Sequence, residues 1–167
     1  YKEETKEQTV GVRLESGGTS ANLYCIDLQT LSVVASVEKF APEGETVQSA
    51  RFEGRKAYVC TAIRVTDPVF AFDLSDLNNI AYTDTGIIDG YSISLIKFKN
   101  DTLLGIGYNE DLNLKIELYR ETLTMLESVT SYEPKNHVNF SQEFKAYYID
   151  STNGYVGLLD GNSGMYI

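Results

Sequence analysis

The feature of this sequence that most constrains its fold is a repeat with a fixed period of 46 residues. The stretch "NLYCIDLQTL" ends at Leu31, "VFAFDLSDL" ends at Leu77 and "KIELYRETL" ends at Leu123. The same shift superposes Tyr24, Phe70 and Ile116, and it also superposes Ile26, Phe72 and Leu118. Over two copies it superposes Asp27 on Asp73 and Phe52 on Phe98. Self-similarity at one offset is typical of chains built from repeated supersecondary units.

Within each repeat, apolar residues alternate with a period of two, which predicts strands. The second copy contains "VQSARFE", "KAYVCTAI", "VFAFDL" and "IAYTDTGI", separated by turn residues at Gly54, Asp67-Pro68 and Asn78-Asn79. The third copy repeats this order as "SISLIKF", "TLLGIGY", "LKIELY" and "LTMLESVT". Because no stretch shows a helical stripe, we expect an all-β chain in which each unit has four short strands.

Four antiparallel strands recurring every 40 to 50 residues are typical of a β-propeller blade. The predicted fold is a β-propeller fragment of about three and a half four-stranded blades, forming one partial domain over residues 1–167. Residues 47–88 and 91–130 form complete blades, whereas 8–40 and 134–167 form incomplete blades of three strands each. A β-sandwich is the alternative, although a sandwich does not need units that match at one offset.

Incomplete blades leave strand edges and sheet faces uncovered, which favours association. The sequence therefore predicts either a truncated propeller or a propeller that pairs with a second copy of itself. Cys25 and Cys60 lie in apolar strands, where buried free thiols are expected and a disulfide stays open.

The net charge of −10 argues against nucleic acid as a partner, because the protein repels phosphate backbones. No apolar run reaches the roughly 18 residues of a membrane span, so no direct membrane insertion by this segment is expected. The chain begins with "YKEETKEQ", without Met, and reads as a piece of a longer protein, so it says nothing about an export signal.

Three stretches resemble a known family: "ARFEGRKAYVCTA", "TDPVFAFDLSD" and "LLGIGYNED", followed by "FKAYYIDSTNGYVGLL". They are similar to secreted bacterial proteins that carry a C-terminal β-propeller domain distantly related to WD40 repeats. The resemblance covers about residues 47–160, and it departs where Asn78, Asn79 and Ile80 replace the usual Pro and where Phe144 replaces a His. It implies an extracellular or cell-surface location and transfers no defined activity.

The sequence offers little for catalysis, and we expect no enzyme, no cofactor and no metal. His137 is the single histidine, and no GxSxG, HExxH or Walker-type glycine loop is present. Four acidic turns, "DLSD", "NEDLN", "DSTNG" and "DGNSG", place oxygen atoms close together, but none has the spacing of an EF-hand calcium loop. Asx-type turns explain them without a metal.

The best candidate for a binding site is formed by the loops that precede the first strand of each unit. These loops are "APEGETV" (41–47), "IIDGYSI" (87–93) and "YEPKNHV" (132–138), and the repeat places them on one face. The candidate binding residues are Glu45, Asp89, Tyr91, Tyr132, Lys135 and His137.

The leading hypothesis is therefore a non-enzymatic extracellular scaffold or binding module, with a protein or a carbohydrate as ligand. One alternative is a fragment of an extracellular hydrolase or lyase whose other blades supply the catalytic groups. Another is a regulatory propeller attached to a catalytic domain. Fold alone does not decide among them.

Overall fold

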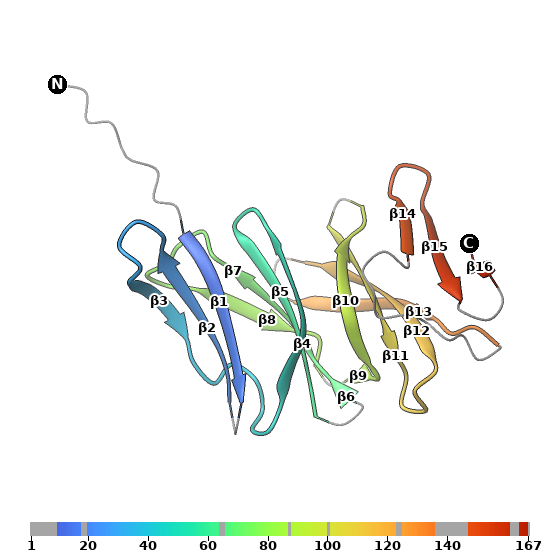
Figure 1. Ribbon diagram of the computed structural model, residues 1–167, viewed down its shortest axis with the longest axis horizontal. Helices are drawn as coiled ribbons and strands as arrows, with labels where there is room; N and C mark the ends of the chain where they lie inside the picture. Colours follow the sequence, from blue (N-terminus) through green and yellow to red (C-terminus); the bar gives the residue numbers. More distant parts are fainter. Residues whose placement is uncertain are drawn as a thin grey trace.

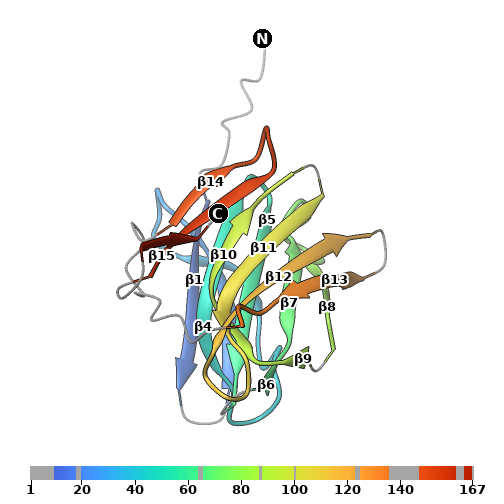
Figure 2. The same ribbon diagram turned by 90° about the vertical axis from the view of Figure 1, so that its right-hand side faces the viewer.

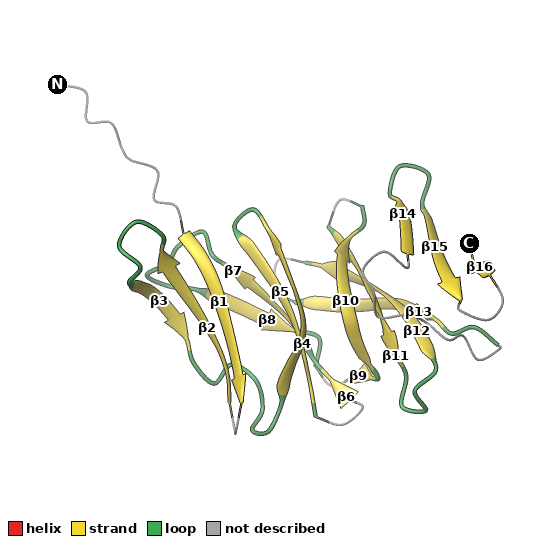
Figure 3. Ribbon diagram, in the orientation of Figure 1, coloured by secondary structure: helices red, strands yellow, loops and turns green. Residues whose placement is uncertain are grey.

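A computed structural model of the chain describes residues 10–17, 20–63, 66–86, 88–99, 101–122, 125–135, 147–160 and 164–166. In these residues the chain forms antiparallel strands and turns, and no helix (Figure 3). The all-β prediction is confirmed. No helix in the described ranges is long and apolar enough to cross a membrane.

Four principal sheets follow one another along the chain (Figure 1). The first sheet contains β1 (Val10–Gly17), β2 (Ser20–Asp27) and β3 (Val33–Val37). The second contains β4 (Thr46–Glu53), β5 (Lys56–Ala62), β7 (Val69–Asp73) and β8 (Ala81–Asp84). The third contains β10 (Tyr91–Lys97), β11 (Thr102–Tyr108), β12 (Leu114–Glu121) and β13 (Leu126–Tyr132). The fourth contains β14 (Tyr147–Asp150), β15 (Tyr155–Asp160) and β16 (Gly164–Tyr166).

These sheets contain three, four, four and three strands, in sequential antiparallel order. Two further strands, β6 (Thr66–Asp67) and β9 (Ile88–Asp89), pair with each other beside the second and third sheets. In the tail, β16 was not expected, and the expected strand "HVNFSQ" (137–142) lies outside the described residues. The architecture is that of a β-propeller fragment, as predicted.

The sheets pack face against face, and Figure 2 shows their stacking from the side of the last sheet. One core cluster joins the first and second sheets, where Phe40 contacts Phe70 and Phe72 with ring centroids 5.1 and 5.0 Å apart. A second cluster joins the second and third sheets around Tyr58 and Tyr119, and a third joins the third and fourth. Cys25 and Cys60 are buried and form no disulfide with each other, and burial raises the pKa of Cys25.

The strand ladders correct the 46-residue alignment in the third strand of the units. Ala57 pairs with Phe72, and its counterpart Leu103, 46 residues later, pairs with Tyr119. Phe72 is therefore equivalent to Tyr119 and Phe70 to Glu117, an offset of 47 residues, so the superposition of Phe70 on Ile116 is wrong. The reason is a connection one residue longer between β11 and β12 than between β5 and β7. A one-residue shift matters because it turns every side chain to the other face of the sheet.

The first strands are shifted in the opposite sense. Phe52 pairs with Ala57, whereas Lys97 pairs with Leu103, so Phe52 corresponds to Lys97 and not to Phe98. The turn between β10 and β11 is longer than the two-residue turn between β4 and β5. The offset between equivalent residues therefore changes with the length of the connecting turns, while the order of the strands in each sheet stays the same.

The three repeated leucines are equivalent in position but not in burial. Leu31 follows β2 and Leu77 follows β7, both in the connection to the last strand of a sheet. Leu31 is 77% exposed at a φ of 56°, whereas Leu77 packs against the first core cluster. Leu123 lies outside the described residues.

Candidate functional site

The candidate site lies on the face where the chain passes from one sheet to the next, which we call the loop face. Because neighbouring strands are antiparallel, these passages lie on the same side as the loops between the second and third strands of each sheet. The described parts of the loop face are 38–45, 63, 66–68, 85–86, 88–90, 109–113 and 133–135, at the lower edge in Figure 1. The opposite side, with connections such as 54–55 and 74–80, is called the turn face.

Glu45 anchors the first of the predicted loops. The Thr61 hydroxyl at the end of β5 donates a hydrogen bond to the Glu45 carboxylate, and both side chains are buried. The backbone N–H of Glu45 also donates to the carbonyl oxygen of Pro42 at 3.2 Å. Burial raises the pKa of Glu45, and the Thr61 hydrogen bond opposes part of that rise. Glu45 therefore holds the loop in place from inside and is not presented to solvent.

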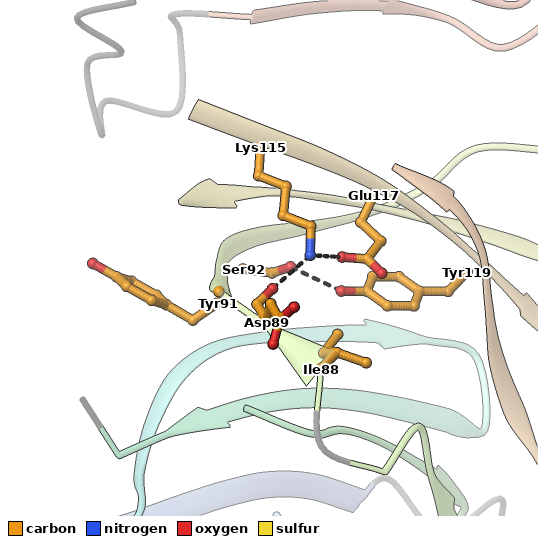
Figure 4. A pocket seen from close by; sticks show the side chains of 8 residues that line it. Ile88, Asp89, Tyr91, Ser92, Lys115, Glu117 and Tyr119 are labelled. Carbon is orange, nitrogen blue, oxygen red and sulfur yellow. Dashed lines mark hydrogen bonds and ion pairs between the residues drawn. The ribbon is translucent and has the colours of Figure 1, made fainter. Parts of the chain in front are cut away.

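An ion pair on β12 anchors the second loop. Lys115 and Glu117 are two positions apart and therefore lie on the same face of the strand. Lys115 Nζ lies 2.6 Å from Glu117 Oε2, and the two side chains are only 10% and 7% exposed. The Lys115 ammonium also donates to the carbonyl oxygen of Asp89 at 2.5 Å, as Figure 4 shows. The Ser128 hydroxyl donates to the other carboxylate oxygen of Glu117. The buried charges are therefore paired and hydrogen-bonded, and one of these bonds fixes the backbone at Asp89.

Ser92 connects this cluster to the second sheet. Its backbone N–H lies 3.3 Å from Cys60 Sγ, and its carbonyl oxygen accepts a hydrogen bond of 2.7 Å from the Ser49 hydroxyl. Its own hydroxyl lies 3.3 Å from the Tyr119 hydroxyl. These contacts join two neighbouring sheets through polar groups, so the two sheets hold their relative position at the loop face.

The hollow between these groups has a volume of about 10 Å³ and is lined by Asp89, Tyr91, Lys115, Glu117 and Tyr119, among others (Figure 4). Such a volume is close to the space of one water molecule. The cluster therefore positions the loops and is too small to enclose a ligand. Among the described residues there is no group of three or more His, Cys, Asp or Glu side chains arranged to hold a metal ion.

The other predicted residues are spread over the same face. The Asp89 side chain and Lys135 are exposed, Tyr132 is 58% exposed, and Tyr91 is half-buried with its ring 5.8 Å from that of Tyr108. His137 lies outside the described residues. The structure bonds the backbone of Asp89 to Lys115, packs Tyr91 against Tyr108 and buries Glu45.

Sequence reasoning missed Lys115, Glu117 and Tyr119. A usable signal was present in "LKIELYRE", where apolar residues alternate with charged or polar ones in a third strand. A third strand of an inner blade is covered by sheets on both faces, so charged side chains there have to be buried and paired. The 46-residue alignment hid this by assigning the apolar positions to the wrong face.

A second polar cluster crosses the same pair of sheets nearer the turn face. The Tyr58 hydroxyl donates to Glu121 at 2.9 Å, and the Lys56 ammonium lies 2.8 Å from the same oxygen. Burial and then the Glu121 carboxylate raise the pKa of Tyr58. This cluster joins β5 to β12 and adds to the polar contacts between the second and third sheets.

Three of the four acidic turns, "DLSD", "NEDLN" and "DSTNG", form the predicted Asx turns, whereas residues 161–163 of "DGNSG" lie outside the described residues. The carboxylates of Asp73, Asp76 and Asp150 accept backbone N–H bonds of 2.9, 3.0 and 2.9 Å from residues two or three positions later. Hydrogen bonds from Ser75 lower the pKa of Asp73, and those from Asn153 lower the pKa of Asp150. The local backbone explains these carboxylates.

Comparisons with known proteins agree with this architecture. The chain is 33% identical over 130 residues to an uncharacterized protein of Methanocaldococcus jannaschii, a match that covers 76% of this chain and 20% of that protein. It is 29% identical over 150 residues to an uncharacterized protein of Archaeoglobus fulgidus, covering 86% of this chain and 23% of that protein. The chain thus spans about a fifth of the length of these relatives, which are archaeal.

No solved structure matches the chain. The model of the family described as Beta propeller domain matches residues 8–157, which include the first three sheets, β14 and the first half of β15. The β-propeller part of the expected resemblance is confirmed, and the chain belongs to the Beta propeller domain family.

Proposed function

We propose that this chain is part of a non-enzymatic extracellular binding module that binds a basic segment of a partner protein on its loop face. The supporting observation is the charge of that face. Six exposed carboxylates lie in its described connections, against two exposed lysines, Lys39 and Lys135. The six are Glu38, Glu43, Asp89, Glu110, Asp111 and Glu133. Complementary charge attracts a cationic partner and gives binding specificity.

Several contacts hold these carboxylates in place. Lys115 fixes the backbone of Asp89, and the Asn109 side chain donates to Glu133 at 2.8 Å, which links two loops. The side-chain oxygen Oδ1 of Asn109 also accepts hydrogen bonds from the backbone N–H groups of Asp111 and Asn113, at 3.1 and 2.8 Å. Loops that are already ordered lose less conformational entropy on binding. Of the two ligand classes expected, a basic protein segment fits this charge better than a neutral carbohydrate.

The test is a titration with a fluorescent lysine-rich peptide at two salt concentrations. The triple variant Asp89→Asn/Glu110→Gln/Asp111→Asn is expected to lose at least about tenfold in affinity and most of its salt dependence. The control Glu53→Gln/Asp101→Asn/Glu127→Gln changes the net charge equally, away from the loop face. Equal loss in both variants contradicts a site on the loop face and indicates attraction to the net charge alone.

The extracellular location rests on the resemblance to secreted propeller proteins. It is tested by treating intact cells that express the complete reading frame with a protease that does not enter them. Degradation of the propeller segment without lysis supports the proposal. Protection that is lost only after lysis contradicts it.

Self-association through the first sheet belongs to the same proposal. Tyr24 and Ile26 occupy the ladder positions that Phe70 and Phe72 occupy in the second sheet, and these two phenylalanines are buried against the first sheet. Tyr24 and Ile26 are on the outer face of the first sheet, together with Val34, which is 40% exposed. We expect multi-angle light scattering to show a dimer that Tyr24→Ser/Ile26→Ser converts to a monomer. A wild-type monomer at high concentration contradicts this.

A further inference from the structure

A cavity of about 440 Å³ lies between the first and second sheets on the turn face. Val10 and Val12 of β1 line one side, and Leu74 and Leu77 from the connection after β7 line the other. The volume is within the range of about 300 to 1,000 Å³ that is typical of small-molecule sites.

The repeat explains why this space is open. Val10 and Val12 pair with Asp27 and Cys25, just as Lys56 and Tyr58 pair with Asp73 and Ala71. The valines are therefore equivalent to Lys56 and Tyr58. Across the cavity, Asp73 and Arg120 occupy equivalent ladder positions at the ends of their strands. Leu74, which follows Asp73, is therefore equivalent to Glu121, which follows Arg120.

Between the second and third sheets, the equivalent positions are filled by the Tyr58 ring and by Lys56 and Glu121, which bond to one another. Valine and leucine at these positions are shorter and apolar, so they leave open a volume that the larger side chains occupy at the neighbouring interface. The cavity is therefore a specific difference between two copies of one interface. Val10, Val12, Leu74 and Leu77 make one part of its wall apolar, whereas Arg55, Ser75, Asp76 and Asn78 make the rest polar. Three of these apolar side chains, Val10, Val12 and Leu74, stand where the next interface has a lysine, a tyrosine and a glutamate.

Two opposite charges lie at the mouth of the cavity without meeting each other. Arg55 and Asp76 both line it and both are exposed, and neither takes part in an ion pair within the described chain. Arg55 donates one hydrogen bond, of 3.4 Å, to the carbonyl oxygen of Ser75. Asp76 Oδ1 accepts the backbone N–H of Asn78 at 3.0 Å, and no residue in the described ranges bonds to its other carboxylate oxygen. A ligand that carries both charges can pair with the two groups at once.

We propose that this cavity binds a small zwitterion with an apolar body, of the class of apolar dipeptides. The ligand carboxylate pairs with the Arg55 guanidinium, and its ammonium group pairs with the Asp76 carboxylate. Charge-assisted hydrogen bonds of this kind are about twice as strong as neutral ones. The apolar side chains of the ligand pack on Val12 and Leu74, where burial of apolar surface favours binding. This site is separate from the loop face and does not depend on the function proposed there.

The experiment titrates the isotope-labelled chain with L-leucyl-L-leucine and follows amide chemical shifts by NMR. We expect saturable shifts at residues lining the cavity. The doubly blocked N-acetyl-L-leucyl-L-leucinamide, which has the same apolar body and no charge, is expected to bind about tenfold more weakly or worse. Equal binding of the two compounds, or the absence of saturable shifts at the cavity with the free dipeptide, overturns the proposal.

Variants assign the two charges. Arg55→Gln and Asp76→Asn are each expected to weaken dipeptide binding about tenfold, because each leaves one ligand charge without a partner. Arg51→Gln and Asp101→Asn change the same charges at exposed positions that do not line the cavity, and are expected to leave binding unchanged. Equal effects of the test and control variants overturn the proposal.

A filling variant tests the cavity itself. Val12→Tyr introduces the side chain that Tyr58 contributes at the equivalent position, and we expect it to abolish dipeptide binding while the spectrum stays dispersed. Unchanged binding in a folded Val12→Tyr protein places the ligand elsewhere and overturns the proposal. Where Val12→Tyr does not fold, the Arg55 and Asp76 variants decide the outcome, because both replaced side chains are exposed.

Discussion

The Lys115 ammonium lies 2.6 Å from the Glu117 carboxylate, and both side chains are enclosed between the second and third sheets. At the equivalent interface between the first and second sheets, the position of Glu117 is occupied by Phe70, which packs on Phe40. One interface of the repeat is therefore apolar where the next contains a paired charge. This difference produces the first prediction.

Removing one member of the pair destabilises the fold strongly. Lys115→Met or Glu117→Gln is expected to lower the free energy of unfolding by about 3 to 5 kcal/mol. In each variant the remaining charged side chain stays buried without the opposite charge that compensates it. Replacing both, in Lys115→Met/Glu117→Leu, is expected to recover most of that loss. Urea denaturation followed by circular dichroism measures it.

The control for this pair is Arg51 with Glu53, whose nitrogen and oxygen lie 3.0 Å apart with both side chains 46% exposed. Arg51→Met is expected to cost less than about 1 kcal/mol, because water screens exposed pairs. A single Lys115 or Glu117 variant that costs no more than Arg51→Met contradicts the buried pair.

Glu45 gives a prediction for the pH dependence of stability. Because burial raises its pKa in the folded state above the ordinary value of 4.5, the folded protein binds more protons at this group than the unfolded chain does. The contribution of Glu45 is therefore most favourable below pH 4.5, and it is lost as the pH rises from there through the raised pKa of the folded state. Above that pKa the group destabilises the fold.

Glu45→Gln removes this titration. The stability of the wild type relative to Glu45→Gln is expected to fall as the pH rises from 4.5, and urea denaturation at successive pH values measures it. Glu43→Gln removes the same charge at a neighbouring exposed position and is the matched control for net charge. A difference that stays constant with pH, or rises with it, contradicts the buried carboxyl. The pKa values of Asp73 and Asp150 are lowered in the folded state, so these two groups make stability rise with pH. They do so below pH 3.8, the ordinary pKa of Asp, and therefore do not reproduce the trend expected for Glu45.

Phe72 tests the packing of the first interface. Its side chain is 1% exposed and lies in edge-to-face contact with Phe40. Phe72→Ala is expected to cost about 3 to 5 kcal/mol, because it leaves a cavity in a packed core. Phe52→Ala, at a position 43% exposed on β4, is the control and is expected to cost much less. Thermal denaturation of both variants distinguishes a stacked core from a loosely associated set of sheets.

Much of the fold was predictable from the sequence, because strands and turns leave local signals. The nearly continuous apolar runs in "KAYVCTAI" and "TLLGIGY" mark strands covered on both faces. Asp73 and Asp76 mark turns by their side-chain hydrogen bonds to the backbone. The repeat then indicates how many such units there are. These signals do not depend on contacts between distant residues, so one sequence is enough to read them.

Register and the interior of the site were not predictable in the same way. A single extra residue between β11 and β12 moves Glu117 to the position of Phe70, and column matching at a fixed offset cannot detect it. The bonds from Thr61 to Glu45 and from Lys115 to Asp89 join residues 16 and 26 positions apart. They follow from how the sheets pack, and no local pattern encodes them.

The most direct test of the stacked-sheet account is a double-mutant cycle across the second and third sheets, with Tyr58→Phe, Glu121→Gln and the double variant. Their hydrogen bond of 2.9 Å joins β5 to β12 over 63 positions of sequence, so the two residues couple only if the sheets pack with this register. Urea denaturation is expected to give a coupling energy of about 0.5 to 3 kcal/mol. Additive effects of the two substitutions, with no coupling beyond measurement error, contradict the stacking and register described for this chain.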